Sequence, residues 1–185
     1  MTTAVFLGDS ITLGYNVTTP WALMLANRFW WTPVINAVGG TGYLAGPPTF
    51  RSRVPAVLAA NPDIVIVAGG FNDVNFPVVD VGTECGLCLD ALASVPTVIV
   101  LSPFNGVDRP APYNSPGRVE PYTYAIRDQA YGRGRLFIDM QHSRPWLNEN
   151  CNVYEQADGG HPNQAGHDYL ASMLFDYIVG SRIAT

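Results

Sequence analysis

The segment Ile64-Val65-Ile66-Val67-Ala68 constrains the fold of this 185-residue chain more than any other. It is β-branched at nearly every position and is followed by Gly69-Gly70. A strand that is apolar at successive positions is buried on both faces, as in a parallel sheet that helices cover on either side. The segment therefore predicts a central strand of an α/β protein.

Four further apolar runs repeat this pattern, and helix-like segments separate them. We expect strands over Ala4–Leu7, Val34–Val38, Ile64–Ala68, Val98–Leu101 and Leu136–Ile138. We expect helices over Pro20–Trp31, Ser52–Ala60, Gly86–Ala93, Pro121–Tyr131 and Pro162–Val179. Right-handed crossovers join alternating strands and helices into a mainly parallel sheet with helices on both faces. The length suits one domain over residues 1–185, and we expect no second one.

Composition and charge limit the partners of the chain. Apolar residues make up 48% and charged residues 14%, as in a globular protein. The net charge of −5 argues against a nucleic-acid partner and against an anionic membrane surface. No apolar run is long enough to span a membrane, and the N-terminus lacks the regions of a signal peptide.

The three cysteines do not form a metal-binding or redox pattern. Cys85 and Cys88 form a C-x-x-C in an apolar, helix-like segment, and Cys151 stands alone. Without a second pair, two packed thiols or a local disulfide are the expected states of Cys85 and Cys88. We therefore expect neither a metal nor a cofactor.

A serine follows the first expected strand, in the segment Gly8-Asp9-Ser10. Open parallel sheets bind ligands at the carboxyl ends of their strands, which is where Ser10 would lie. Serine is also a common helix N-cap, so Ser10 is either a cap or a nucleophile. As a nucleophile it needs an adjacent base that accepts its proton.

The segment Asp158-Gly159-Gly160-His161-Pro162 offers that base and an acid to orient it. The two glycines let the loop fold so that the carboxylate reaches the ring, and Pro162 favours extended backbone at His161. An imidazole accepts a proton near neutral pH, and a carboxylate fixes its tautomer. Alternatively, His161 caps the last helix and Asp158 lies in solvent. We expect His142 and His167 to be surface or packing residues, because neither has an acid at this spacing.

Two glycine-rich segments offer hydrogen-bond donors to a developing oxyanion. Gly39-Gly40-Thr41-Gly42-Tyr43 follows the second strand, and its glycines expose backbone N–H groups. Gly69-Gly70-Phe71-Asn72-Asp73 follows the third strand, and the Asn72 side chain carries an amide donor. An oxyanion hole needs such donors about 3 Å from the charge. Ordinary turns are the alternative for both segments, with Asp73 as a cap of the next one.

From Gly8 to the last helix, these segments together resemble the SGNH hydrolases, also called the GDSL esterase/lipase family. Gly8-Asp9-Ser10-Ile11-Thr12 is similar to the first block of that family, with Ile11 at the namesake leucine. The resemblance implies a flavodoxin-like three-layer α/β/α sandwich with a five-stranded, mainly parallel sheet. The chain lacks the Gly-x-Ser-x-Gly elbow, which disfavours the α/β-hydrolase arrangement.

The resemblance also implies the roles of individual residues. Ser10, Asp158 and His161 would form a catalytic triad. The oxyanion hole would consist of the Ser10 N–H, the Gly40 N–H and the Asn72 side chain. Gly39 is the alternative to Gly40, because the spacing from Asn36 is one residue shorter than in the family.

The expected activity is the hydrolysis of carboxylic esters through an acyl-enzyme. We expect substrate contacts from Asp9, Tyr43, Phe71 and Asn105. The aromatic and polar residues near the expected site suit a sugar-bearing ester, such as an acetyl group on carbohydrate; they are Tyr43, Phe71, Asn75, Phe76, Asn105 and Trp146. The resemblance also covers lysophospholipases and thioesterases, so longer acyl chains are an alternative.

A non-catalytic carbohydrate-binding or attachment module is a hypothesis of a different class. From the first strand, which begins almost at once, and from the short C-terminal tail, we would then expect a domain of a larger envelope or virion protein. Under this hypothesis we would expect the protein to be secreted or associated with a virion or cell envelope. The presence of Ser10, Asp158 and His161 favours an enzyme instead.

Overall fold

A single parallel sheet forms the centre of the protein. The computed structural model describes residues 1–103, 116–140 and 151–181. The sheet order is β2-β1-β3-β4-β5, with all neighbouring strands parallel. The strands are β1 (Thr3–Gly8), β2 (Thr32–Ala37), β3 (Ile64–Ala68), β4 (Thr97–Leu101) and β5 (Leu136–Ile138). This order is that of flavodoxin-like folds, as expected.

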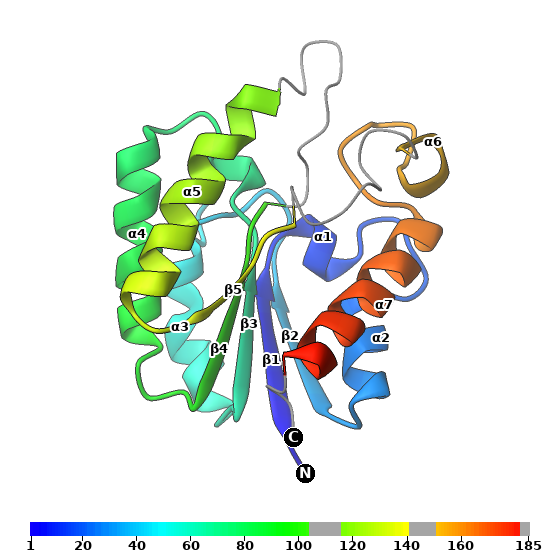
Figure 1. The fold of residues 1–185 in the computed structure, drawn as a ribbon, viewed down its shortest axis with the longest axis horizontal. Coiled ribbons are helices and arrows are strands. Elements are labelled where there is room, and N and C mark those ends of the chain that lie inside the picture. Colours follow the sequence, from blue (N-terminus) through cyan, green and yellow to red (C-terminus); the bar gives the residue numbers. More distant parts are fainter. Residues whose placement is uncertain (104–115, 141–150, 182–185) are drawn as a thin grey trace.

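Helices cover both faces of this sheet and complete the three-layer sandwich (Figure 1). Helices α3, α4 and α5 lie on one face, and α1, α2 and α7 lie on the other (Figure 1). The helices are α1 (Ser10–Leu13), α2 (Trp21–Arg28), α3 (Phe50–Ala59), α4 (Val78–Ala91), α5 (Pro116–Gly132), α6 (Cys151–Tyr154) and α7 (Gln164–Gly180). A short 3₁₀ turn, η1 (Phe71–Asp73), follows β3. The two short helices α1 and α6 and the turn η1 were not expected from the sequence.

The two faces of β3 belong to two different hydrophobic cores. Ile64, Ile66 and Ala68 pack with residues of α2 and α7. Val65 and Val67 pack with residues of α3, α4 and α5. Successive side chains of a strand point to opposite faces, so each position of β3 meets a helix layer. This double burial explains the uninterrupted apolar run and confirms β3 as a central strand.

Helix α4 is longer than expected, and two glycines lie inside it. It begins at Val78, whereas the sequence predicted a start at Gly86. A Cβ on Gly82 would lie 3.4 Å from the Ala125 Cβ, and a Cβ on Gly86 would clash with Gln129. Both glycines therefore lie on the face of α4 that contacts α5.

The thiols of Cys85 and Cys88 are free and buried within α4, which confirms packed thiols rather than a disulfide. Burial raises the pKa of each thiol to about 12. Both groups are therefore protonated at neutral pH and unreactive. In the described ranges, no group of three or more His, Cys, Asp and Glu side chains could hold a metal ion.

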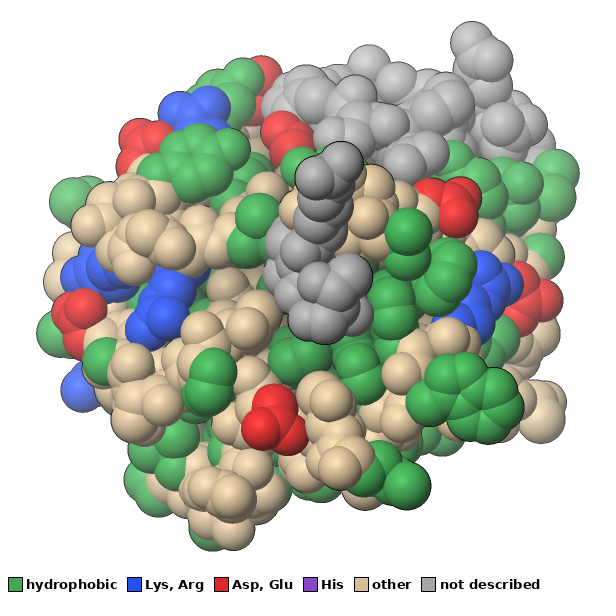
Figure 2. All heavy atoms as spheres, turned by 60° about the horizontal axis from the view of Figure 1, so that its bottom comes forward, with side chains coloured by type: hydrophobic (Ala, Val, Ile, Leu, Met, Phe, Trp, Pro, Cys, Tyr) green, Lys and Arg blue, Asp and Glu red, His purple; other side chains and the backbone are tan. Residues whose placement is uncertain are grey.

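The outer surface mixes apolar, uncharged and charged side chains. On the face shown in Figure 2, arginine side chains lie near acidic ones. Among the residues that the structure describes, surface ion pairs join Arg51 to Glu84, Arg127 to Asp128 and Arg133 to Asp90. Among the helices that the structure describes, none is both long and apolar enough to cross a membrane.

His167 is a buried packing residue that joins α2 to α7. Its Nδ1 accepts a hydrogen bond from the Trp21 N–H at 3.1 Å, and its side chain is inaccessible to solvent. Burial lowers the pKa of His167 to about 4, with Asp168 opposing the shift and His161 adding to it. The ring is therefore neutral at physiological pH, and the interpretation of His167 as a packing residue is confirmed.

The lowered pKa of His167 predicts that acid destabilises the fold. Below about pH 6.5 the unfolded chain protonates this histidine, whereas the folded chain does so only near pH 4. His167→Asn keeps an acceptor at the position of Nδ1 and removes the titration. Between pH 7.5 and pH 4, the free energy of unfolding of the wild type should fall by on the order of 3 kcal/mol relative to this variant. Urea unfolding at several pH values measures this difference, and a constant difference would contradict the prediction.

Candidate active site

Ser10 lies at the carboxyl edge of the sheet, directly after β1. It is the first residue of α1, and Asp9 is the N-cap, its Oδ1 accepting a hydrogen bond from the Ile11 N–H at 3.0 Å. A Cβ on Gly8 would clash with Thr12, so glycine is required at this tight turn. The capping role therefore belongs to Asp9 and not to Ser10, which leaves the serine hydroxyl free for another partner.

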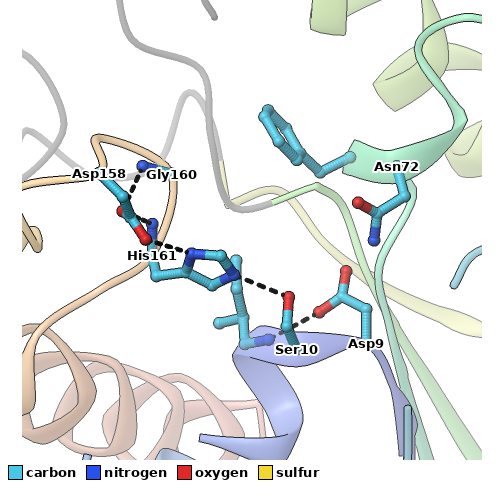
Figure 3. Close-up of a pocket in the computed structure, with 8 residues that line it drawn as sticks. Asp9, Ser10, Asn72, Asp158, Gly160 and His161 are labelled. Atoms are coloured by element: carbon cyan, nitrogen blue, oxygen red, sulfur yellow. Dashed lines mark hydrogen bonds and ion pairs between the residues drawn. The ribbon is translucent and has the colours of Figure 1, made fainter. Parts of the chain in front are cut away.

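That partner is the ring of His161, although 151 residues separate the two in sequence. The His161 Nε2 lies 2.9 Å from the Ser10 Oγ, and the Nδ1 lies 2.8 Å from the Asp158 Oδ2 (Figure 3). The cap of α7 is Asn163, whose side chain accepts a hydrogen bond from the Gly166 N–H at 3.0 Å. The alternative in which His161 caps the last helix is therefore wrong, and Asp158, although exposed, is hydrogen-bonded to the His161 ring.

Asp158 is held in its ionised form by the loop that carries it. Its Oδ1 accepts hydrogen bonds from the Gly160 N–H at 2.9 Å and the His161 N–H at 3.1 Å. Partial burial pushes the pKa of Asp158 upward, but these bonds and the His161 ring outweigh it and hold the pKa below its ordinary value. An ionised Asp158 keeps the proton of the neutral imidazole on Nδ1 and directs the free Nε2 lone pair at Ser10.

Asn72 lines the same cleft as Ser10, from the turn that follows the neighbouring strand β3. It lies in η1 after β3, and its Nδ2 donates a hydrogen bond to the Thr41 carbonyl at 2.9 Å. In the glycine loop after β2, a Cβ on Gly39 would lie 3.6 Å from the Ser10 Cβ, whereas Gly40 has a φ of +72°. The loop thus runs between the serine and the amide, with both glycines exposed.

Asp73 anchors this glycine loop to η1. Its carboxylate is inaccessible to solvent and accepts three backbone hydrogen bonds of 2.8 Å each, from Tyr43, Leu44 and Ala45. Such charge-assisted bonds to N–H groups are strong. The carboxylate therefore fixes the preceding loop, which differs from the alternative in which Asp73 caps the following segment.

Arg53 of α3 is a second connector that the sequence analysis missed. Its buried guanidinium donates to the Gly8 carbonyl at 2.9 Å, the Thr41 Oγ1 at 3.0 Å and the Asn36 carbonyl at 2.8 Å. Burial lowers the pKa of Arg53, and the charge of the nearby Asp9 opposes this shift. An arginine on the buried face of an apolar helix, three residues after Phe50, is the signal that could have revealed it.

A cleft of about 260 Å³ opens above Ser10. It is lined by Asp9, Ser10, Ile11, Phe71, Asn72, Asp158, Gly160 and His161 (Figure 3). Burial raises the pKa of Asp9 to about 6, against the lowering effects of the Ile11 N–H and of His161. Tyr15, which the sequence analysis did not single out, places its ring 4.6 Å from that of His161 while remaining 47% exposed.

The expected substrate-binding residues divide into three groups. Asp9 and Phe71 line the cleft. Tyr43 is 1% exposed and packs against Phe50 in the core, so the prediction that it contacts substrate is wrong. The bond from its N–H to Asp73 fixes the loop with the ring turned inward. Asn105, like Trp146 and His142, lies outside the described residues.

Fold and site together define a class of protein. A serine, an imidazole and a carboxylate in hydrogen-bonded sequence, with an amide donor nearby, make up the arrangement that serine-dependent acyl hydrolases use. Residues 6–169 match the GDSL-like Lipase/Acylhydrolase family, and the chain belongs to this family. The protein is accordingly a carboxylic ester hydrolase.

Solved structures with the same fold include proteins of related names. A lipase/acylhydrolase from Enterococcus faecalis superposes with a TM-score of 0.82 at 21% identity, covering 98% of this chain and 97% of that one. A carbohydrate acetylesterase from Sinorhizobium meliloti has a TM-score of 0.74 at 15% identity, with coverage of 97% and 99%. An acetylxylan esterase from Geobacillus stearothermophilus has a TM-score of 0.74 at 20% identity, with coverage of 96% and 95%. A comparison with curated protein sequences finds no match.

Proposed function

We propose that Ser10, His161 and Asp158 form the catalytic triad by which this enzyme hydrolyses esters through an acyl-enzyme. The supporting observation is the chain of contacts from the Ser10 Oγ to the His161 Nε2 (2.9 Å) and from the His161 Nδ1 to the Asp158 Oδ2 (2.8 Å). The Ser10 Oγ attacks the ester carbonyl while the His161 Nε2 takes its proton. Asp158 stabilises the imidazolium, which then protonates the departing alcohol. Water, deprotonated by His161, releases the acid and restores Ser10.

The oxyanion of the tetrahedral intermediate is bound, in this proposal, by the Ser10 N–H, the Asn72 Nδ2 and the Gly40 N–H. The place of Asn72 in the lining of the cleft supports its role. Asp73 and Arg53 support the role of the loop, because they tie it to η1 and to the end of β1. Gly39 is the alternative to Gly40, because it lies beside Ser10.

We propose short acyl groups, such as acetyl groups on carbohydrate, as the substrate class. The cleft of about 260 Å³ is smaller than the pockets of about 300–1,000 Å³ that hold drug-sized ligands, which favours a small acyl group. The exposed ring of Tyr15 beside His161 offers an apolar surface on which a sugar leaving group could pack. Two proteins of this fold carry the names of a carbohydrate acetylesterase and an acetylxylan esterase.

A series of p-nitrophenyl esters of increasing acyl length tests the substrate class. We expect kcat/KM to be highest for acetate and butyrate and to fall beyond four carbons, because the cleft leaves a longer chain in water. Release of acetate from acetylated xylo-oligosaccharides tests the carbohydrate leaving group. A maximum at octanoate or longer esters would favour a lysophospholipase or thioesterase instead.

The hypothesis of a non-catalytic binding module needs a separate measurement. A fluorophosphonate probe should label the wild type at Ser10 and leave Ser10→Ala unlabelled, because only an activated serine attacks the phosphorus. Absence of labelling in the folded wild type would favour the binding module. We further propose that residues 1–185 are one catalytic domain, because Ser10 follows β1 near the start of the chain and His161 lies directly before α7 near its end.

A further inference from the structure

We propose that Gln156 is a positioning residue that holds the loop of His161 against the turn of Ser10. This inference rests on the proposed triad. The Gln156 Nε2 donates two hydrogen bonds, one to the Tyr15 carbonyl at 2.7 Å and one to the Pro162 carbonyl at 2.9 Å. One side-chain amide thereby joins two segments that lie more than a hundred residues apart in sequence.

The two carbonyls lie in the segments that carry the proposed nucleophile and the proposed base. The Tyr15 N–H donates to the Ser10 carbonyl at 3.0 Å, so Tyr15 closes the helical turn that Ser10 begins. Pro162 directly follows His161. The Gln156 amide therefore links the turn that begins at Ser10 to the loop of His161. In the proposed mechanism the proton moves from Ser10 to His161, between these two segments. The Tyr15 ring also packs beside the His161 ring, with 4.6 Å between the two ring centroids.

The loop itself is closed by main-chain bonds that do not need this side chain. The Gln156 N–H donates to the His161 carbonyl at 2.8 Å, and the Gly159 N–H donates to the Gln156 carbonyl at 3.0 Å. Glu155 and Pro162 form an isolated antiparallel bridge. A substitution at Gln156 therefore preserves the main-chain bonds of the loop and removes the bond from the side chain to the Tyr15 carbonyl. This separation makes the role testable without unfolding the protein.

A primary amide suits this place because it donates two hydrogen bonds without carrying a charge. A carboxylate of the same size would instead face two carbonyl oxygens and repel both. Catalysis depends steeply on such alignment, since a displacement of about 1 Å can cost about 10²-fold in rate. In this proposal, Gln156 keeps the His161 Nε2 at 2.9 Å from the Ser10 Oγ.

Gln164, at the start of α7, provides a matched control. Its Nε2 donates to the Thr19 carbonyl at 3.0 Å, and its Oε1 accepts from the Thr18 and Thr19 N–H groups at 3.1 Å each. It joins the segment after α1 to the C-terminal part of the chain, as Gln156 does. Its bonds, however, reach neither the turn that begins at Ser10 nor the loop of His161.

The experiment compares wild type, Ser10→Ala, Gln156→Ala, Gln156→Glu and Gln164→Ala. Hydrolysis of p-nitrophenyl acetate gives kcat and KM, and circular dichroism gives the fold and the Tm. For Gln156→Ala we expect kcat to fall about 10- to 100-fold with KM within twofold. We expect Gln164→Ala to lower the Tm to a similar degree with kcat within twofold. Gln156→Glu keeps the size of the side chain and should lower kcat at least as much as Gln156→Ala.

Three results would overturn the inference. The first is a folded Gln156→Ala, or a folded Gln156→Glu if the alanine variant does not fold, that keeps kcat within twofold of the wild type. The second is an equal loss of kcat in Gln156→Ala and Gln164→Ala, which would make Gln156 a general stabiliser. The third is a wild type without Ser10-dependent activity, which would overturn the proposed triad as well. Ser10-dependent activity in the wild type thus separates a failure of the triad from a failure of Gln156 alone.

Discussion

Ser10→Ala is expected to lower kcat/KM for p-nitrophenyl acetate by on the order of 10⁴- to 10⁶-fold. The change deletes the oxygen that lies 2.9 Å from the His161 Nε2, and with it the bond that the acyl-enzyme requires. Asp9 still caps α1, so we expect the fold to persist. Steady-state kinetics, with circular dichroism as the control of folding, measures the effect. Activity within tenfold of the wild type would contradict the assignment of Ser10 as nucleophile.

The double variant Ser10→Ala/His161→Ala gives a second test of the same site. Serine and imidazole serve one proton transfer, so removing both should cost no more than removing the more important one alone. Each single variant should therefore be nearly as slow as the double variant. Losses that multiply across the two changes would show that the two side chains act independently.

Asn72→Ala is expected to lower kcat by about 10²- to 10³-fold with little change in KM. Its amide faces the cleft, and it would donate most strongly when charge develops on the carbonyl oxygen. The variant also loses the bond from the Asn72 Nδ2 to the Thr41 carbonyl, which should cost about 1 kcal/mol in the free energy of unfolding. Kinetics and urea unfolding of the same variant separate the two effects.

Asn72→Asp is the matched control for this prediction, because it keeps the shape of the side chain. A carboxylate at this place accepts rather than donates and carries the same sign of charge as the intermediate. We expect kcat at least as low as that of Asn72→Ala. A folded Asn72→Ala with nearly full kcat would leave the oxyanion to backbone N–H groups alone and end the assignment of Asn72.

The strands were predictable because burial on both faces leaves a direct trace in the sequence. The ranges Ile64–Ala68 and Leu136–Ile138 agree with the structure at both ends. The second strand was misplaced by two residues at its start, since it runs over Thr32–Ala37 and includes Pro33. It is an edge strand, where proline is tolerated because one side of its backbone needs no partner.

The candidate site was predictable where local backbone chemistry marks it. Glycines and prolines beside Ser10 and His161 identify tight turns at strand and helix ends. Tyr43 was misjudged because Asp73, thirty residues away, decides which way its loop turns. Gln156 was missed for a related reason, because its acceptors are backbone carbonyls, and every residue has one.

The position of the cleft between the two helix layers has a kinetic consequence. His161 enters the site from the segment before α7, on one face of the sheet, whereas Arg53 of α3, on the other face, holds the glycine loop that we propose binds the oxyanion. A substitution that loosens the helix layer of α7 should impair proton transfer by His161 and leave the affinity for a phosphonate mimic of the intermediate unchanged. A substitution that loosens the helix layer of α3 should weaken the affinity for the phosphonate, while Ser10 still reacts with small, highly activated acylating agents.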